Sequence, residues 1–126
     1  MALMRKAARA CISARLLLQA GDADGACNRA YYAMFDAAKA VLLEYTGADD
    51  AALGKTHSGL ITAFGLHLVK PGIVALELGR ALNRAEEVRL IADYKGDSID
   101  AVDAGEMVAS AEAFVAAMQT KFSPDS

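Results

Sequence analysis

The chain has 126 residues, a net charge of −3 and a hydrophobic content of 55%, with two cysteines, two prolines and no tryptophan. This length suits one domain with its own core, and few helix breakers together with abundant alanine and leucine predict an all-α protein. The negative charge argues against nucleic-acid binding through bulk charge alone. The longest apolar run near the start, Leu16–Leu18, is too short for a signal peptide or a membrane span.

The expected helices follow from the spacing of apolar residues and from capping signals. Five are predicted, over about Ala2–Ala20, Asp22–Tyr45, His57–Val69, Ile73–Tyr94 and Asp100–Lys121. Asp22 or Asp24 is expected to cap the second helix, and Asp103 with Glu106 fits a capping box that would start the last helix later. The short loops favour antiparallel neighbours, so we expect an up-and-down helical bundle. Residues 1–122 are assigned to one domain and residues 123–126 to a C-terminal tail.

The first helix is basic. Its segment, residues 1–21, contains no acidic residue and four cations, Arg5, Lys6, Arg9 and Arg15. The segment carries +4, so the rest of the chain carries −7. A solvated helix face is the simpler interpretation, and a patch that meets phosphate groups or a partner is the alternative.

The two cysteines do not form a CxxC motif. A helical hairpin about Gly21–Gly25 would place Cys11 and Cys27 far apart along the bundle, so no disulfide between them is expected. Two free thiols suit a reducing cytoplasm, which is the expected compartment.

The second helix has two rows of side chains at helical spacing. The apolar row predicts the core face and contains Cys27, Ala30, Tyr31, Met34, Ala38, Val41 and Tyr45. The neighbouring polar row contains Arg29, Tyr32, Asp36 and Lys39. This polar row is either a solvated face or part of a site.

A polar group, Lys55 to Gly59, precedes and begins the third helix. Its cation, hydroxyls and imidazole would lie beside free backbone N–H groups that favour a phosphate. The simpler interpretation is that Thr56 and Ser58 cap the helix. The two histidines, His57 and His67, lack further ligands nearby, so no metal and no cofactor is expected.

The fourth helix ends on RLIADY, which contains Arg89, Asp93 and Tyr94. An ordinary ion pair between Arg89 and Asp93 would contribute about 0.3 kcal/mol. The order of the pair is the less favourable one, and an acid near a helix C-terminus opposes the helix dipole. This placement suggests that Asp93 has another partner, such as Arg29 or a ligand.

Three segments resemble the small bacterial and archaeal HEPN domain proteins: RAYYAMFDAAKAVL, KTHSGLITAFG with a following LVKPG, and LNRAEEVRLIADY. The resemblance runs from about residue 5 to residue 122. It implies an up-and-down bundle with a four-helix core, often a homodimer, that acts beside a minimal nucleotidyltransferase encoded as a separate chain. In many HEPN proteins it also implies metal-independent RNA cleavage, by an arginine and a histidine at the dimer interface.

The chain departs from the arginine–histidine pattern of those ribonucleases. After Arg89, the positions where the family pattern places histidine hold Tyr94, Lys95 and Gly96. His57 is the remaining candidate for the imidazole that would act on a ribose hydroxyl, provided that the third helix brings it near Arg89.

Three functions are consistent with the sequence. The leading one is a HEPN-type module that binds a nucleotide or RNA phosphate and works with a minimal nucleotidyltransferase, as in a toxin–antitoxin pair, with no membrane partner. The alternatives are an endoribonuclease toxin that uses Arg89 and His57 at a dimer interface, and a purely structural dimer. The expected ligand-binding residues are Arg29, Tyr32, Asp36, Lys55, Thr56, His57, Ser58, Asp93 and Tyr94.

Overall fold

The computed structural model describes residues 2–47, 56–95 (without the side chains of 93–95) and 99–122. These residues form α1 (Ala2–Gln19), α2 (Ala23–Thr46), α3 (His57–Phe64), a π-helical turn η2 (Gly65–Val69), α4 (Leu76–Lys95) and α5 (Ala101–Phe122). The part of the chain so described contains helices and no strand, which confirms the predicted all-α class.

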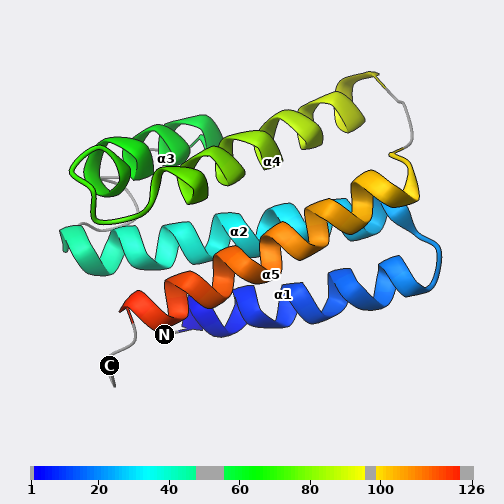
Figure 1. The fold of residues 1–126 in the computed structure, drawn as a ribbon, viewed down its shortest axis with the longest axis horizontal. Helices are drawn as coiled ribbons and strands as arrows, with labels where there is room; N and C mark the ends of the chain where they lie inside the picture. Colours follow the sequence, from blue (N-terminus) through cyan, green and yellow to red (C-terminus); the bar gives the residue numbers. More distant parts are fainter. Residues whose placement is uncertain (1, 48–55, 96–98, 123–126) are drawn as a thin grey trace.

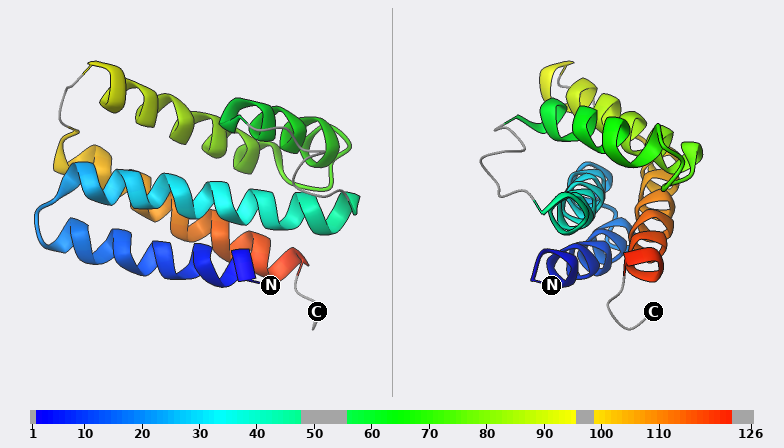
Figure 2. Two further views of the ribbon diagram at one scale, coloured as in Figure 1. Left: turned by 180° about the vertical axis from the view of Figure 1, so that it is seen from behind. Right: turned by 90° about the vertical axis from the view of Figure 1, so that its left-hand side faces the viewer.

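The four long helices lie side by side, and the short α3 lies at one end of α4 (Figure 1). α1 and α2 form a hairpin, α5 packs against both of them, and α4 contacts α2. Seen along the bundle, α5 lies to the right of α2, α1 lies below it and α3 above it (Figure 2, right). A face of α2 is therefore bordered by α1 at one edge and by α3 and α4 at the other.

α2 is the central element of the core. Its fully buried large side chains, Tyr31, Met34, Val41 and Leu42, lie in the same core as Phe64 of α3 and Phe114 of α5. The rings of Phe64 and Phe114 are 5.8 Å apart. Because many of the other buried residues of α1, α2 and α5 are alanines, these helices can approach closely.

Two large apolar residues are exposed, and one of them, Tyr45, belongs to the row predicted to form the core face. Tyr45 is 51% exposed because it lies in the last turn of α2, beyond the part of the helix that its neighbours cover. Leu16 is 60% exposed and shares its outward face of α1 with Ile12. The periodic pattern gave the correct face for most of α2, but it does not report where a neighbouring helix stops.

Capping residues set most helix ends as expected. The side chains of Asp22 and Thr56 accept hydrogen bonds from the N–H groups of Gly25 and Gly59, each at 2.9 Å. Gly47 ends α2 in the left-handed conformation, with φ of 70°. Asp100 accepts a hydrogen bond from the N–H of Asp103 at 2.8 Å, so α5 begins at the earlier of the two predicted positions.

The region between α3 and α4 differs from the prediction. The helix predicted from His57 to Val69 has the expected extent, but its second part is the π-helical turn η2. α4 begins at Leu76, not at Ile73, because the N–H of Val74 donates to the carbonyl of Leu68 at 2.8 Å. The intervening residues are thereby tied to η2 and do not start the next helix.

Candidate functional site

Tyr31 of α2 lies at the centre of the candidate site. Its side chain is fully buried, and its hydroxyl lies 3.0 Å from Nδ1 of His57, the first residue of α3. Thr56 positions that histidine, because its capping hydrogen bond starts α3 at this point. The hydrogen bond thus ties the beginning of α3 to the middle of α2.

Aromatic rings from α2 surround the His57 imidazole. The ring centroid of Phe35 lies 4.4 Å from that of His57, and the Tyr32 ring meets His57 edge-on at 5.7 Å and 84°. Tyr32, Phe35 and His57 are all partly exposed, whereas Tyr31 beneath them is not. The arrangement is a buried tyrosine covered by two accessible aromatic rings and one accessible imidazole.

Arg89 and Glu86 of α4 complete the group. The guanidinium carbon of Arg89 lies 4.8 Å from the centroid of the Tyr31 ring, within the range of a cation–π contact. Its terminal nitrogen lies 3.4 Å from a carboxylate oxygen of Glu86, and the two side chains are 17% and 14% exposed. We call Tyr31, Tyr32, Phe35, His57, Glu86 and Arg89 the Tyr31 cluster.

The surroundings of Tyr31 and Arg89 set the protonation state of both side chains. Burial raises the pKa of Tyr31 far above its usual value, the Glu86 carboxylate raises it further, and Arg89 opposes the shift only in part. Burial by itself would lower the pKa of Arg89, but Glu86 and Tyr31 outweigh it and the net shift is upward. At neutral pH the tyrosine is therefore neutral and the arginine charged.

Asp36 lies on the same face of α2 and is 7% exposed. Burial raises the pKa of its carboxyl, and the positive charges of Lys6, Arg29 and Lys39 oppose this, as does His57. No hydrogen bond to this carboxylate occurs among the described residues. Asp36 therefore lies in the combined field of cations from α1 and α2 and of the imidazole at the start of α3.

The structure brings only some of the predicted site residues together. His57, Arg89 and Tyr32 belong to one cluster, and Asp36 lies within the electrostatic reach of His57. Arg29 instead lines a hollow between α1 and α2, beside Lys6 and Arg9. The suggested contact of Arg29 with Asp93 involves a side chain that lies outside the described residues.

The remaining predicted residues divide in two. Thr56 acts as the helix cap that the simpler interpretation assigned to it, and Ser58 is exposed beside it. Lys55 lies outside the described residues, as do the side chains of Asp93 and Tyr94, although the backbone of both belongs to α4.

Sequence reasoning missed the central tyrosine. Tyr31 falls in the apolar row of α2, and its burial confirms that assignment, but its hydroxyl is also a partner of His57. Glu86 was visible as a neighbour of Arg89 at helical spacing, yet nothing in that spacing showed that both would face Tyr31. A tyrosine within the predicted core row was the available signal, because a buried hydroxyl requires a partner.

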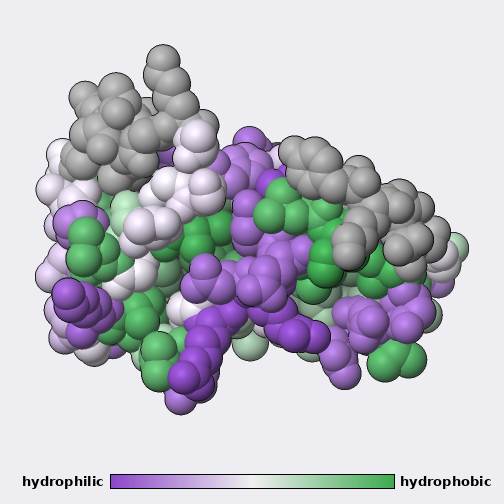
Figure 3. Space-filling view, turned by 90° about the horizontal axis from the view of Figure 1, so that it is seen from above, coloured by the Kyte–Doolittle hydropathy of each residue, from purple (hydrophilic) through white to green (hydrophobic). Residues whose placement is uncertain are grey.

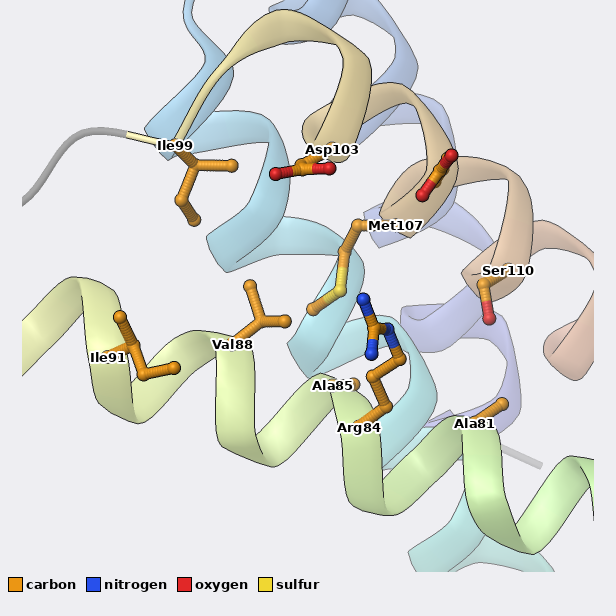
Figure 4. A pocket seen from close by; sticks show the side chains of 10 residues that line it. Ala81, Arg84, Ala85, Val88, Ile91, Ile99, Asp103, Met107 and Ser110 are labelled. Carbon is orange, nitrogen blue, oxygen red and sulfur yellow. The ribbon is translucent and has the colours of Figure 1, made fainter.

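Other parts of the surface are also polar or hollowed. A band of hydrophilic side chains crosses the middle of the face that α3 and α4 present (Figure 3). The exposed polar residues of α4 include Arg80, Asn83, Arg84 and Glu87. Between α4 and α5 lies a pocket of about 480 Å3. Val88, Ile91 and Met107 line it, and Arg84 reaches across it from α4 (Figure 4).

Two further observations concern the described residues as a whole. Among them, no three side chains of His, Cys, Asp or Glu gather where they could hold a metal ion. No helix in this part of the chain combines the length and the apolar character needed to cross a membrane.

The protein is thus a helical bundle in which a tyrosine, a histidine and an arginine from three helices lie in contact. The HEPN domain matches residues 1–121, nearly the whole chain, and the chain belongs to the HEPN domain family. The family resemblance seen in the sequence motifs is thereby confirmed.

Curated relatives come from bacteria and archaea. A UPF0332 protein of Gloeobacter violaceus is 38% identical over 94 residues, covering 75% of this chain and 71% of the relative. A UPF0332 protein of Thermotoga maritima is 42% identical over 91 residues, covering 71% of this chain and 65% of the relative. A protein of Methanocaldococcus jannaschii named "Putative toxin MJ0605" is 37% identical over 90 residues, covering 71% of this chain and 63% of the relative.

Proposed function

We propose that this HEPN domain binds a phosphate group of a nucleotide or of RNA at the Tyr31 cluster. The observation that carries the proposal is the position of Arg89, which lies over the Tyr31 ring, while the hydroxyl of the same tyrosine contacts His57. A charged guanidinium and an imidazole thus border one small region. Arginine binds phosphate oxygens through paired N–H groups, which suits this role.

The aromatic residues of the cluster supply a second kind of contact. Tyr32 and Phe35 are partly exposed and lie beside His57, so a base adjoining the bound phosphate has ring faces to stack upon. Cations interleaved with aromatic rings are typical of proteins that bind single-stranded nucleic acid. RNA is therefore the form of phosphate ligand that we favour.

Fluorescence anisotropy with a short labelled single-stranded RNA tests the proposal. Arg89→Gln is expected to weaken binding about ten- to hundredfold, the range for losing a charged hydrogen bond of 1.5–3 kcal/mol. Arg80→Gln is the matched control, because Arg80 is exposed on α4 and lies nine residues away, on the opposite side of the helix. Circular dichroism of both variants establishes that each is folded. Equal affinity of Arg89→Gln and wild type would refute phosphate binding at this cluster.

A second candidate function is metal-independent RNA cleavage. This function is favoured because His57 and Arg89 both contact Tyr31. In such a reaction, His57 would take the proton of a ribose 2′-hydroxyl, whose oxygen attacks the adjacent phosphorus. The bond from phosphorus to the 5′-oxygen breaks, the leaving oxygen is protonated, and Arg89 would stabilise the charge on the phosphoryl oxygens.

Cleavage is distinguished from binding by its products. RNA incubated with the protein in EDTA would be converted to fragments that end in a 2′,3′-cyclic phosphate and a 5′-hydroxyl. His57→Gln would lower the rate by about a hundredfold or more. If RNA stays intact with concentrated protein while its binding still depends on Arg89, cleavage is refuted and the binding function stands.

We also propose that the chain works as a cytoplasmic homodimer with a minimal nucleotidyltransferase, as one member of a toxin–antitoxin pair. The toxin name of the Methanocaldococcus jannaschii relative supports a role in such a pair. Several large apolar side chains are exposed and would be covered in a dimer: Ile12, Tyr45, Leu66, Leu76, Ile91 and Val102. Both cysteines are free and buried, which suits a reducing compartment. Light scattering after size exclusion, and co-purification with the product of a neighbouring nucleotidyltransferase gene, test the two partners.

A further inference from the structure

The hollow between α1 and α2 is lined by three cations from two different helices. Lys6 and Arg9 of α1 and Arg29 of α2 border a space of about 530 Å3, together with the hydroxyl-bearing Ser13 and the apolar Leu16 and Leu17. This arrangement depends on the packing of the hairpin, because the three cations are up to 23 positions apart in the sequence. We call Lys6, Arg9, Ser13 and Arg29 the α1–α2 basic pocket.

We propose that the α1–α2 basic pocket binds backbone phosphates of the same single-stranded RNA that engages the Tyr31 cluster. The proposal rests on the proposed function and adds a second binding site to it. The pocket lies outside the Tyr31 cluster and shares none of its residues.

Within the described part of the chain, the cations of this pocket form no ion pair, and the acidic group that interacts with two of them over a longer range is the buried carboxyl of Asp36. Among the described residues, neither Lys6, Arg9 nor Arg29 forms an ion pair within 4 Å. Two other arginines do have such partners: Arg15 pairs with Glu112 across α1 and α5, and Arg89 pairs with Glu86. The protein has 16 acidic residues against 13 Lys and Arg, so three adjacent cations, none of them in an ion pair among the described residues, stand out from an acidic chain.

The composition of the pocket suits phosphate groups. Two guanidinium groups offer planar pairs of N–H donors, Lys6 adds a mobile ammonium, and Ser13 adds a hydroxyl donor. The site is an open hollow with cations from two helices at its border, so donors from both helices are available to a small tetrahedral anion. A flat acidic protein surface would reach fewer of these groups, which makes phosphate the favoured ligand.

The position of the pocket links it to the Tyr31 cluster. On a helix with 3.6 residues per turn, Arg29, Tyr32 and Asp36 share one face of α2. That face has the pocket at its α1 edge and His57 at its α3 edge, and Asp36 senses both Lys6 and His57. The two sites are thus separated by about the width of one helix, roughly 10 Å, which a short stretch of RNA can cross.

The test is the salt dependence of RNA binding by the full chain. Each phosphate contact with a single strand contributes about 0.7 to the slope of log affinity against log salt concentration. Lys6→Ala/Arg9→Ala is therefore expected to flatten the slope by about 1.4, which corresponds to roughly 25-fold weaker binding at 0.1 M salt. Arg9→Glu alone should weaken binding as well. The charge-matched control is Arg80→Ala/Lys121→Ala, since both residues are exposed on other helices, and it should keep the wild-type slope.

Three results are distinguishable. A flatter slope in Lys6→Ala/Arg9→Ala but not in the control supports the second phosphate site. A slope equal to that of the control, with Arg89→Gln still weakening binding, overturns the second site and leaves the proposed function standing. Absence of RNA binding by the wild-type protein at low salt overturns both.

Discussion

Replacing Tyr31 by phenylalanine is the most selective perturbation of the candidate site. The change removes one hydroxyl and keeps the ring, so the contacts with Tyr32 at 5.2 Å and Phe35 at 6.0 Å persist. The position of Arg89 over the ring is also retained. What is lost is the hydrogen bond of 3.0 Å to Nδ1 of His57, together with the interaction of the hydroxyl with Glu86 and Arg89.

The expected loss of stability follows mainly from the hydrogen bond to His57, whose geometry is direct. A hydrogen bond of this kind contributes about 1 kcal/mol net to folding. The entropy of unfolding is about 2.1 cal/mol/K per residue, or about 0.26 kcal/mol/K for this chain, so Tyr31→Phe should lower the melting temperature by roughly 4 °C. Thermal unfolding followed by circular dichroism at 222 nm measures the shift.

Tyr32→Phe is the matched control, because the hydroxyl of Tyr32 has no hydrogen-bond partner among the described residues. It should unfold within about 1 °C of wild type. Nitrogen-15 spectra of the His57 ring add a direct readout, since loss of the Tyr31 hydroxyl changes the hydrogen bonding of Nδ1 and with it the chemical shifts of the ring nitrogens. An unchanged melting temperature together with an unchanged His57 spectrum in Tyr31→Phe would refute the proposed role of this bond.

Two further predictions concern groups that are buried in the bundle. Because burial raises the pKa of Asp36, its contribution to stability is present at low pH and is lost as the pH rises through the raised pKa. At pH 7, the melting temperature of Asp36→Asn should therefore lie above that of wild type or within about 2 °C of it. The melting temperature of the variant relative to that of wild type should be higher at pH 7 than at pH 3. A large loss of stability at pH 7 would instead favour a structural role for the carboxylate. Burial raises the pKa of Cys11 and Cys27 from 9.0 to about 11, so the native thiols should react with iodoacetamide at least about a hundredfold more slowly than in denaturant. Rapid labelling of the native protein would contradict their burial.

Much of the fold could be predicted from local signals. The caps at Asp22 and Thr56 and the stop at Gly47 act over one turn, so they can be read directly in the sequence. The buried face of α2 follows from helical periodicity for the same reason. The start of α4 could not be predicted, because it depends on the hydrogen bond from Val74 to Leu68 in the π-helical turn.

The site was only partly predictable. His57 and Arg89 could be selected by their chemistry, but their connection through Tyr31 joins residues from three helices. Arg29 and Tyr32 belong to the same polar row, yet they have different neighbours. Arg29 faces α1, whereas Tyr32 packs against His57. Helical spacing places both on one face without showing which neighbour borders each edge.

The sequence alone determined that this chain is helical, that α2 has an apolar row beside a polar one, and that its motifs belong to the HEPN family. Those properties depend on interactions within a few turns or on the order of residues along the chain. Tertiary structure decided that a core tyrosine contacts both His57 and Arg89, and that three cations of α1 and α2 border one hollow. The physical reason is that burial and the field at each side chain depend on which helices pack together, and helical periodicity specifies a face but not its neighbour.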